Sequence, residues 1–179
     1  MCTKTMTQTT YTVRNAHPNE FSQIGELMVQ VYSQLNGFPK PHEQPNYYKM
    51  LANIGDLTQK PNTELLVAVS PNNEIAGGVV YFSDMQYYGS GGTATKEKNA
   101  AGFRLLAVDP NIRGQGIGKL LTNACIAKAK QSNLQNMVIH TTKAMQTAWG
   151  MYEALGFKRA LDLDFMQEQL PVFGFRLQL

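Results

Sequence analysis

Cysteine is scarce in this sequence, and its scarcity limits the class of protein. Cys2 and Cys125 are the two cysteines in 179 residues, too few and too far apart for a disulfide framework or a zinc site. Such usage fits a reducing compartment. We therefore expect a cytoplasmic protein with no bound metal.

Long apolar runs are missing as well. Residues 1–13, MCTKTMTQTTYTV, are polar and contain no apolar core of a signal peptide. No stretch approaches the roughly 18 apolar residues that a membrane-spanning helix needs. These features predict a soluble protein that does not bind a membrane.

The net charge is low. The chain has 16 lysines and arginines against 13 aspartates and glutamates, a formal charge of +3, and the basic residues are scattered. Nucleic-acid binding needs basic residues gathered on one surface, so we expect none here. With 43% hydrophobic residues, the chain is long enough for one domain with a sizeable core, which we expect to span residues 1–179.

The spacing of apolar residues predicts a succession of strands and helices. Residues 84–101 are rich in Gly, Thr and Lys, and we expect them to form a mobile surface loop. The predicted helices cover residues 18–36, 46–54, 116–131 and 144–155. The predicted strands are residues 11–16, a hairpin over 64–82 with a bulge at Gly77 and Gly78, 103–108, 137–141, a strand from Phe157, and 173–179.

Two of these strands, FRLLAV (103–108) and MVIHT (137–141), are almost wholly apolar, which is typical of strands buried on both faces. A predicted helix connects them, and such a crossover implies that the strands pair in parallel. A glycine-rich loop precedes this helix, so it lies at the carboxyl end of the first strand.

This loop, within RGQGIGKLL (113–121), places three glycines directly before the helix. Glycines leave backbone N–H groups uncovered, and a helix N-terminus adds unpaired donors and the positive end of the macrodipole. The loop therefore predicts an anion-binding site, with a plain surface turn as the alternative. A nucleotide-phosphate enzyme is disfavoured: Arg113 and Leu120 break the Walker P-loop pattern, and Lys119 replaces the third glycine of a dinucleotide fingerprint.

Two stretches together resemble a known family. AVDPNIRGQGIGKLL resembles the acyl-CoA-binding motif of the GNAT superfamily of N-acetyltransferases, and MQTAWGMYEALGFKR (145–159) resembles its second motif. The order of predicted elements agrees over almost the whole chain. The resemblance implies a mixed α/β (α+β) fold: a mostly antiparallel central sheet, a parallel strand–helix–strand core that binds acyl-CoA, and helices on both faces.

The resemblance also implies acetyl-CoA as co-substrate and a set of residues that bind it. The backbone of one strand would pair with the pantetheine arm, and the glycine loop would hold the pyrophosphate. These cofactor-binding residues are Leu106, Ala107, Val108, Arg113, Gly114, Gln115, Gly116, Ile117, Gly118 and Lys119.

Tyr152 matches the tyrosine that the family holds near the coenzyme sulfur, where it acts as general acid on the departing thiolate; core packing is the alternative. The chain departs from the family at two positions. Met145 stands where many members have Asn, although Gln146 could supply the polar contact. Arg104 stands where a Glu often serves as general base, so no base is carried over.

We therefore predict an acyltransferase that moves acetyl from acetyl-CoA to a primary amine of a small molecule or peptide by direct attack in a ternary complex. A non-catalytic acyl-CoA-binding regulator on the same fold is the alternative, and a homodimer is compatible with the resemblance. We expect loops 36–46 and 84–101 to select the acceptor. Lesser candidates near the site are His42, Asp84, Tyr87, Tyr88, Glu97 and His140.

Overall fold

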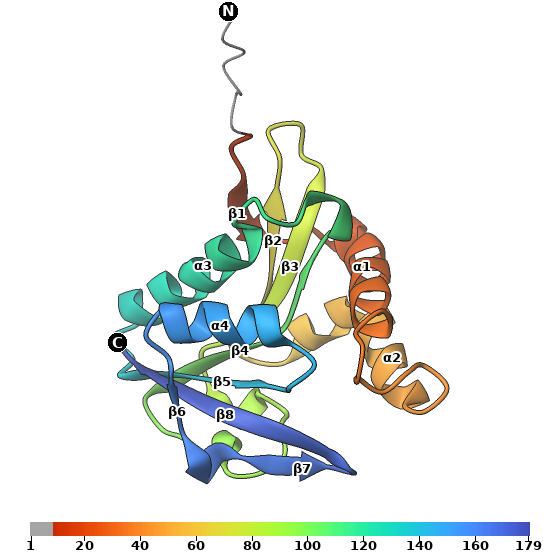
Figure 1. Ribbon diagram of the computed structural model, residues 1–179. Coiled ribbons are helices and arrows are strands. Elements are labelled where there is room, and N and C mark those ends of the chain that lie inside the picture. The colour runs from red at the N-terminus through yellow and green to blue at the C-terminus, as the bar shows by residue number, and fades with distance from the viewer. Residues whose placement is uncertain (1–8) are drawn as a thin grey trace, which may run out of the picture.

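The structure is a computed structural model that describes residues 9–179, so Cys2 lies outside the described residues (Figure 1). Eight strands form its sheet: β1 (Thr12–Asn15), β2 (Thr63–Val69), β3 (Ile75–Phe82), β4 (Ala100–Val108), β5 (Asn136–Thr141), β6 (Lys158–Arg159), β7 (Phe165–Gln167) and β8 (Leu170–Gln178). The α-helices are α1 (Phe21–Ser33), α2 (Pro45–Ala52), α3 (Ile117–Gln131) and α4 (Gln146–Ala154).

The sheet has the strand order β1-β2-β3-β4-β5-β8-β6, and β7 pairs with β8 beside this path. Every pair among the described strands is antiparallel except β4 with β5, which are connected through α3. Helices α1 and α2 lie on one side of the sheet, and α3 and α4 lie on the other (Figure 1). This arrangement confirms the predicted fold class.

Alternation along the strands builds a core on each side of the sheet. In β2, Leu65 and Val67 pack toward α1 and α2, whereas Leu66 and Ala68 pack toward α3 and α4. Cys125 is fully buried in α3, as expected of a core residue. Gly156 ends the α4 segment with φ of 98°, the left-handed conformation that favours glycine after a helix.

The surface loop predicted at residues 84–101 is present, but part of it packs into the core. The segment contains two short 3-10 helices, Met85–Tyr87 and Ala94–Lys96, and its last two residues already belong to β4. Met85, Tyr88 and Ala94 are buried and pack against the α1/α2 core. Three well-placed apolar side chains hold this segment in place, although its average composition is that of a loop.

The bulge predicted in the 64–82 hairpin lies next to the expected position. Val69 pairs with Ile75 and Ala68 with Gly77, so Ala76 is the extra residue in β3. At the C-terminal end, β6 pairs antiparallel with β8, as expected for the strand that starts at Phe157 and the final strand. The final strand starts at Leu170 rather than at residue 173, and β7, which was not predicted, forms a tight antiparallel hairpin with it.

Candidate active site

The parallel strands β4 and β5 part shortly after they meet. They pair at three positions, from Ala100 with Asn136 to Gly102 with Val138, and not beyond. After Gly102, β4 stays paired with β3, while β5 stays paired with β8. The divergence opens the sheet along the second half of β4, directly before the glycine loop.

A bulge in β4 changes which face its residues occupy. Arg104 pairs with Val80 and Ala107 with Gly78, so two residues of β4 oppose one of β3. Leu105 has φ of 62°, an uncommon conformation for a branched side chain. Before the bulge, Phe103 packs toward α3 and α4, whereas Leu105 within the bulge and Ala107 after it pack toward α1 and α2. The bulge therefore aims neighbouring side chains at both sides of the opening.

The glycine loop leads directly into α3. Gly114 and Gly116 have φ of 84° and 77°, and Gly116 is the N-cap of α3. A Cβ at either glycine would meet no atom within 4 Å, so both lie beside open space. The first hydrogen bond of α3 runs from the N–H of Leu120 to the carbonyl oxygen of Gly116. The N–H groups that precede Leu120 in α3 therefore have no partner inside the helix.

A cavity of about 490 Å³ joins the opened sheet to this loop. Among the residues predicted to bind the coenzyme, it is lined by Leu106, Val108, Arg113, Gly114, Gly116, Ile117, Gly118 and Lys119. Ala107 and Gln115 do not line it. The side chain of Ala107 is buried under α1 and α2, and Gln115 is exposed and accepts a 3.2 Å hydrogen bond from the Tyr11 hydroxyl.

Tyr152 also lines this cavity, from α4. Its ring packs against Phe103 and Phe157, with 5.7 Å between ring centroids in both cases. Burial raises the pKa of the Tyr152 phenol, so the group is neutral and keeps its proton across the physiological pH range. Its hydroxyl makes no hydrogen bond with the described part of the chain, which leaves the proton free for a bound molecule.

His140, in β5, lines the cavity, and its two hydrogen bonds fix the tautomer of its ring. Its Nε2 lies 2.8 Å from the carbonyl oxygen of Leu163, which can only accept, so Nε2 carries the proton. Its Nδ1 then accepts from the Tyr88 hydroxyl at 3.0 Å. Burial lowers the pKa of His140, which favours this neutral form. Both nitrogens are therefore occupied within the protein.

The cavity lining contains basic residues and no carboxylate. Its charged side chains are Arg104, Arg113 and Lys119, and no Asp or Glu is present among its lining residues. Met145 and Gln146 also line it, with Gln146 donating a 2.8 Å hydrogen bond to the carbonyl of Lys143. Sequence reasoning missed Tyr32 of α1, which lines the cavity as well; its place on the apolar face of the helix gave it the signature of an ordinary core residue.

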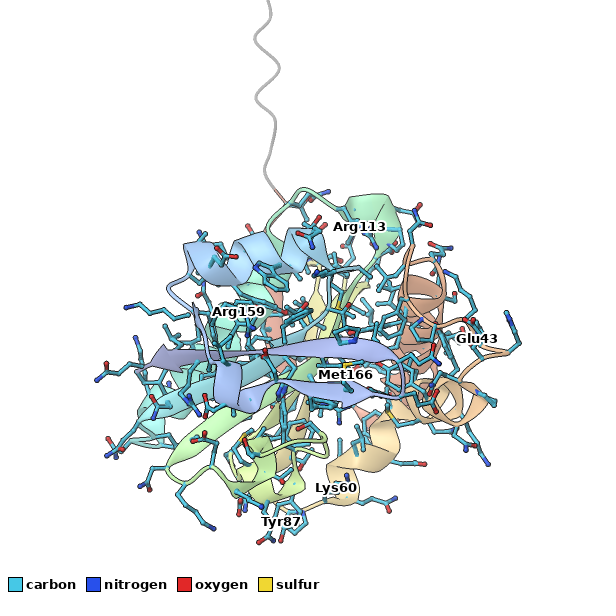
Figure 2. The ribbon with its side chains drawn as sticks, turned by 60° about the horizontal axis from the view of Figure 1, so that its bottom comes forward. Glu43, Lys60, Tyr87, Arg113, Arg159 and Met166 are labelled. Atoms are coloured by element: carbon cyan, nitrogen blue, oxygen red, sulfur yellow. The ribbon has the colours of Figure 1, made fainter. Side chains whose placement is uncertain are left out.

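The loop residues considered as lesser candidates lie outside this cavity. Glu97 pairs with Arg176, Asp84 accepts a 3.0 Å hydrogen bond from the Gln86 amide, and His42 is exposed. Tyr87 lies at the opposite edge of the molecule from Arg113 (Figure 2). Tyr88 is fully buried behind His140. Of this group, His140 alone lines the cavity.

The described residues contain neither a cluster of metal-ligating side chains nor a membrane-spanning helix. Within residues 9–179, no group of three or more His, Cys, Asp or Glu side chains is placed to hold a metal ion. No helix in the same range has the length and apolar character required to cross a membrane.

The sequence profile of the acetyltransferase (GNAT) family matches residues 27–157. The match covers most of the chain, so the chain belongs to this family, and the matched region is a GNAT acetyltransferase domain. The resemblance and the acyltransferase class that the two motifs predicted are thereby confirmed.

Curated relatives match a shorter region. The N-acetylaspartate synthetase of Danio rerio is 36% identical over 64 residues, which are 36% of this chain and 23% of that protein. The chain spans less than a third of the length of the curated relatives that it matches.

Solved structures match almost the whole chain at low sequence identity. A GNAT-family acetyltransferase from Staphylococcus aureus has a TM-score of 0.72 and 17% identity, covering 95% of this chain and 99% of that one. A phosphinothricin acetyltransferase from Sinorhizobium meliloti, solved in complex with acetyl-CoA, has a TM-score of 0.65 and 16% identity, covering 95% and 89%. These similarities establish the shared fold.

Proposed function

We propose that this chain transfers the acetyl group of acetyl-CoA to a primary amine by direct attack in a ternary complex. The observation that carries the proposal is one cavity lined by both the N-terminus of α3 and Tyr152. A cavity with an anion-binding end and a buried phenol can hold both substrates together. No acetylated form of the protein is then needed.

The residues at the anion-binding end suit coenzyme A. The unpaired amides at the start of α3 and the helix dipole favour a pyrophosphate. Arg113 and Lys119 make no ion pair within the described residues, so their charges are available to a ligand. Leu106 and Val108 line the apolar stretch between this end and Tyr152, which suits the pantetheine arm.

Tyr152 would act as the general acid. Acetyl-CoA supplies an activated thioester; the amine nitrogen forms a bond to its carbonyl carbon, and the carbon–sulfur bond breaks. A thiol has a pKa of about 8.5 and leaves as an anion near pH 7, so a proton delivered to sulfur assists its departure. A neutral phenol whose hydroxyl has no partner in the described chain can deliver that proton.

The amine must lose a proton before it attacks. Deprotonating an amine of pKa about 10.4 costs roughly 4.6 kcal/mol at pH 7, whereas one of pKa about 8 costs roughly 1.4 kcal/mol. No carboxylate lines the cavity, and both nitrogens of His140 are already hydrogen-bonded. Removal of the proton by water therefore favours a weakly basic acceptor.

Thiol release from acetyl-CoA, measured across small amines, amino acids, polyamines and peptides, tests this proposal. We expect release that depends on an acceptor, with the N-acetyl product identified by mass spectrometry. Acetyl-CoA at about 100 times its dissociation constant should stabilise the fold by roughly 2.7 kcal/mol, and ATP or NAD far less. Binding of acetyl-CoA without release on any amine would instead support a non-catalytic acyl-CoA-binding regulator.

We further propose that residues 1–179 form a single domain, that the protein is cytoplasmic, that it forms a homodimer, and that it binds neither membranes nor nucleic acid.

A further inference from the structure

Arg104 occupies an unusual position in the candidate active site. It lines the cavity at the β4 bulge, and it forms no ion pair within the described residues. A guanidinium on a partly buried wall with no carboxylate partner is costly unless its donors are satisfied. Its surroundings therefore indicate what it binds.

One side of the Arg104 guanidinium is held by the backbone. Its Nη1 donates to the carbonyl oxygens of Tyr88 and Gly89, at 3.0 and 3.3 Å. Gly89 has φ of 77°, and a Cβ there would lie 3.1 Å from Nη1, so glycine permits this close approach. The ring of Tyr88 lies under the guanidinium, with Cζ 5.7 Å from the ring centroid.

The other edge of the guanidinium, formed by Nε and Nη2, makes no hydrogen bond with residues 9–179. This edge carries two parallel N–H donors, which match the two oxygens of a carboxylate. The surrounding residues add positive charge or neutral donors, not negative charge: Arg113 and Lys119 share the cavity, and His140 is neutral. Burial raises the pKa of the nearby Tyr47 to about 12, so its phenol is also a neutral donor. The positive charge of Arg104 partly offsets this rise in pKa.

Arg104 shares the cavity with the proposed general acid. Consecutive strand residues point to opposite faces of a sheet. Phe103 packs against Tyr152 on the α3/α4 side, whereas the Arg104 guanidinium contacts Tyr88 on the α1/α2 side, so Arg104 and Tyr152 reach the cavity from its two sides. One acceptor bound in this cavity can therefore place its amine toward Tyr152 and its carboxylate toward Arg104.

We propose that Arg104 binds the carboxylate of the acceptor, and that the acceptor is an amine bearing a nearby carboxylate, as an α-amino acid does. This inference rests on the proposed acetyl transfer and names its substrate class. Polycationic amines are disfavoured, because the cavity lining offers them no carboxylate and Arg104 repels a second positive charge.

Matched acceptors test the inference. We would measure thiol release with saturating acetyl-CoA and alanine, aspartate, methionine or phenylalanine, each compared with its α-carboxamide, and with spermidine as the cationic probe. The amide has the less basic amine, so ease of deprotonation favours the amide and cannot cause a preference for the acid. We expect kcat/KM to be at least about 10-fold higher for the best acid than for its amide.

Substitutions then assign the preference to Arg104. Arg104→Gln should lower kcat/KM for the acid by about 10- to 100-fold more than for the amide, and Arg104→Lys should give an intermediate loss because it keeps the charge without the paired donors. Lys143→Gln removes the same charge from an exposed residue that does not line the cavity, and should change neither acceptor. Thermal unfolding and acetyl-CoA affinity of each variant show whether the fold is retained.

A second measurement separates this inference from the proposed function. The N-acetyl derivatives of the same amino acids, titrated by calorimetry with coenzyme A present, should bind the wild type and bind Arg104→Gln at least about 10-fold more weakly. Such binding without turnover on any amine would contradict the proposed acetyl transfer but support Arg104 as a carboxylate-binding residue. Three outcomes would overturn the inference. The first is an equal kcat/KM for acid and amide, and the second is a higher kcat/KM for spermidine or for 1-aminoethylphosphonate than for alanine. The third is an equal fall in kcat/KM for acid and amide in Arg104→Gln.

Discussion

The hydroxyl of Tyr32 in α1 donates a 3.2 Å hydrogen bond to the backbone carbonyl of Leu106 in β4. Leu106 directly follows Leu105, whose φ of 62° forms the bulge. A side chain that is distant in the sequence thus holds the β4 backbone at the bulge, where the side chains of the strand change faces of the sheet. The shape of the candidate active site depends on this contact between helix and strand.

Tyr32→Phe should loosen the bulge without unfolding the protein. Loss of one hydrogen bond lowers the free energy of unfolding by about 1 kcal/mol, and a less well-fixed Leu106 should weaken acetyl-CoA binding. Tyr48→Phe is the matched control, since the Tyr48 hydroxyl donates to the Pro39 carbonyl at 2.7 Å, and neither residue lines the cavity. We expect chemical denaturation to show similar losses for both variants, and calorimetry to show weaker coenzyme binding for Tyr32→Phe alone. Equal affinities would mean that the bond supports only the fold.

Gly118 offers a cleaner test of the coenzyme site than Gly116. A side chain at Gly116 would be strained by its φ of 77°, so lost binding there could reflect a distorted loop. Gly118 lies in the first turn of α3, where a Cβ would make ordinary contacts of 3.7 Å or more with Met151, Val108 and Leu106. Gly118→Val should therefore fold normally, project methyl groups into the cavity and weaken acetyl-CoA binding by about 10-fold or more.

The control for this prediction is Gly150→Val. Gly150 is an exposed helical glycine in α4 that does not line the cavity, so the same substitution should leave coenzyme affinity unchanged. Unaltered binding in a folded Gly118→Val variant would return residues 113–118 to the alternative of a plain surface turn.

How far the sequence predicted this site depends on how local each feature is. The glycine loop and Tyr152 lie in contiguous motifs, so residue types alone indicated them. The bulge at Leu105 could not be predicted, since a leucine with positive φ is stabilised by distant residues such as Tyr32 and not by its own preference. Arg104 was noticed only as a departure from the family, because its partners at Tyr88 and Gly89 belong to a segment expected to be mobile.

The same distinction between local and distant causes applies to the fold. Periodicity located the principal strands and all four α-helices, because each buries a regular apolar face. The segment 84–101 was misjudged because its buried residues are spaced irregularly among polar ones, and average composition conceals them.

Gly150→Ala should stabilise the protein. Gly150 lies inside α4, it is exposed, and a Cβ there would meet no atom within 4 Å. Alanine reduces the conformational freedom of the unfolded chain and is favoured in helices, by about 0.5 to 1 kcal/mol. The melting temperature measured by calorimetry should rise by about 1 to 4 °C. A lower melting temperature would show that the helix needs glycine at this position.

Glu20 should make stability depend on acid pH. Arg14 donates two hydrogen bonds to its carboxylate, at 2.7 and 3.0 Å, and lowers the pKa of Glu20 to about 2. A carboxylate whose pKa is lower in the folded state contributes stability above its unfolded pKa of about 4.3, and loses it as pH falls toward 2.

Glu20→Gln should therefore be less stable than wild type by about 1 kcal/mol at pH 7, with the difference vanishing between about pH 5 and pH 2. Urea denaturation across this range measures the difference, which removes the contributions of other acidic groups. Glu26→Gln, at an exposed position of α1, serves as the control and should follow the wild type. A difference that persists unchanged at pH 2 would assign the loss to packing rather than to charge.

Tyr152→Phe tests the chemistry of the candidate site. The substitution keeps the ring that packs against Phe103 and Phe157 and removes only the hydroxyl. If that hydroxyl protonates the departing thiolate, kcat should fall by about 10²-fold or more, while acetyl-CoA affinity and melting temperature stay nearly unchanged. The loss should be smaller with an acyl donor whose thiol is more acidic, because that leaving group needs less help. A variant with full turnover on its best amine would assign Tyr152 to core packing alone.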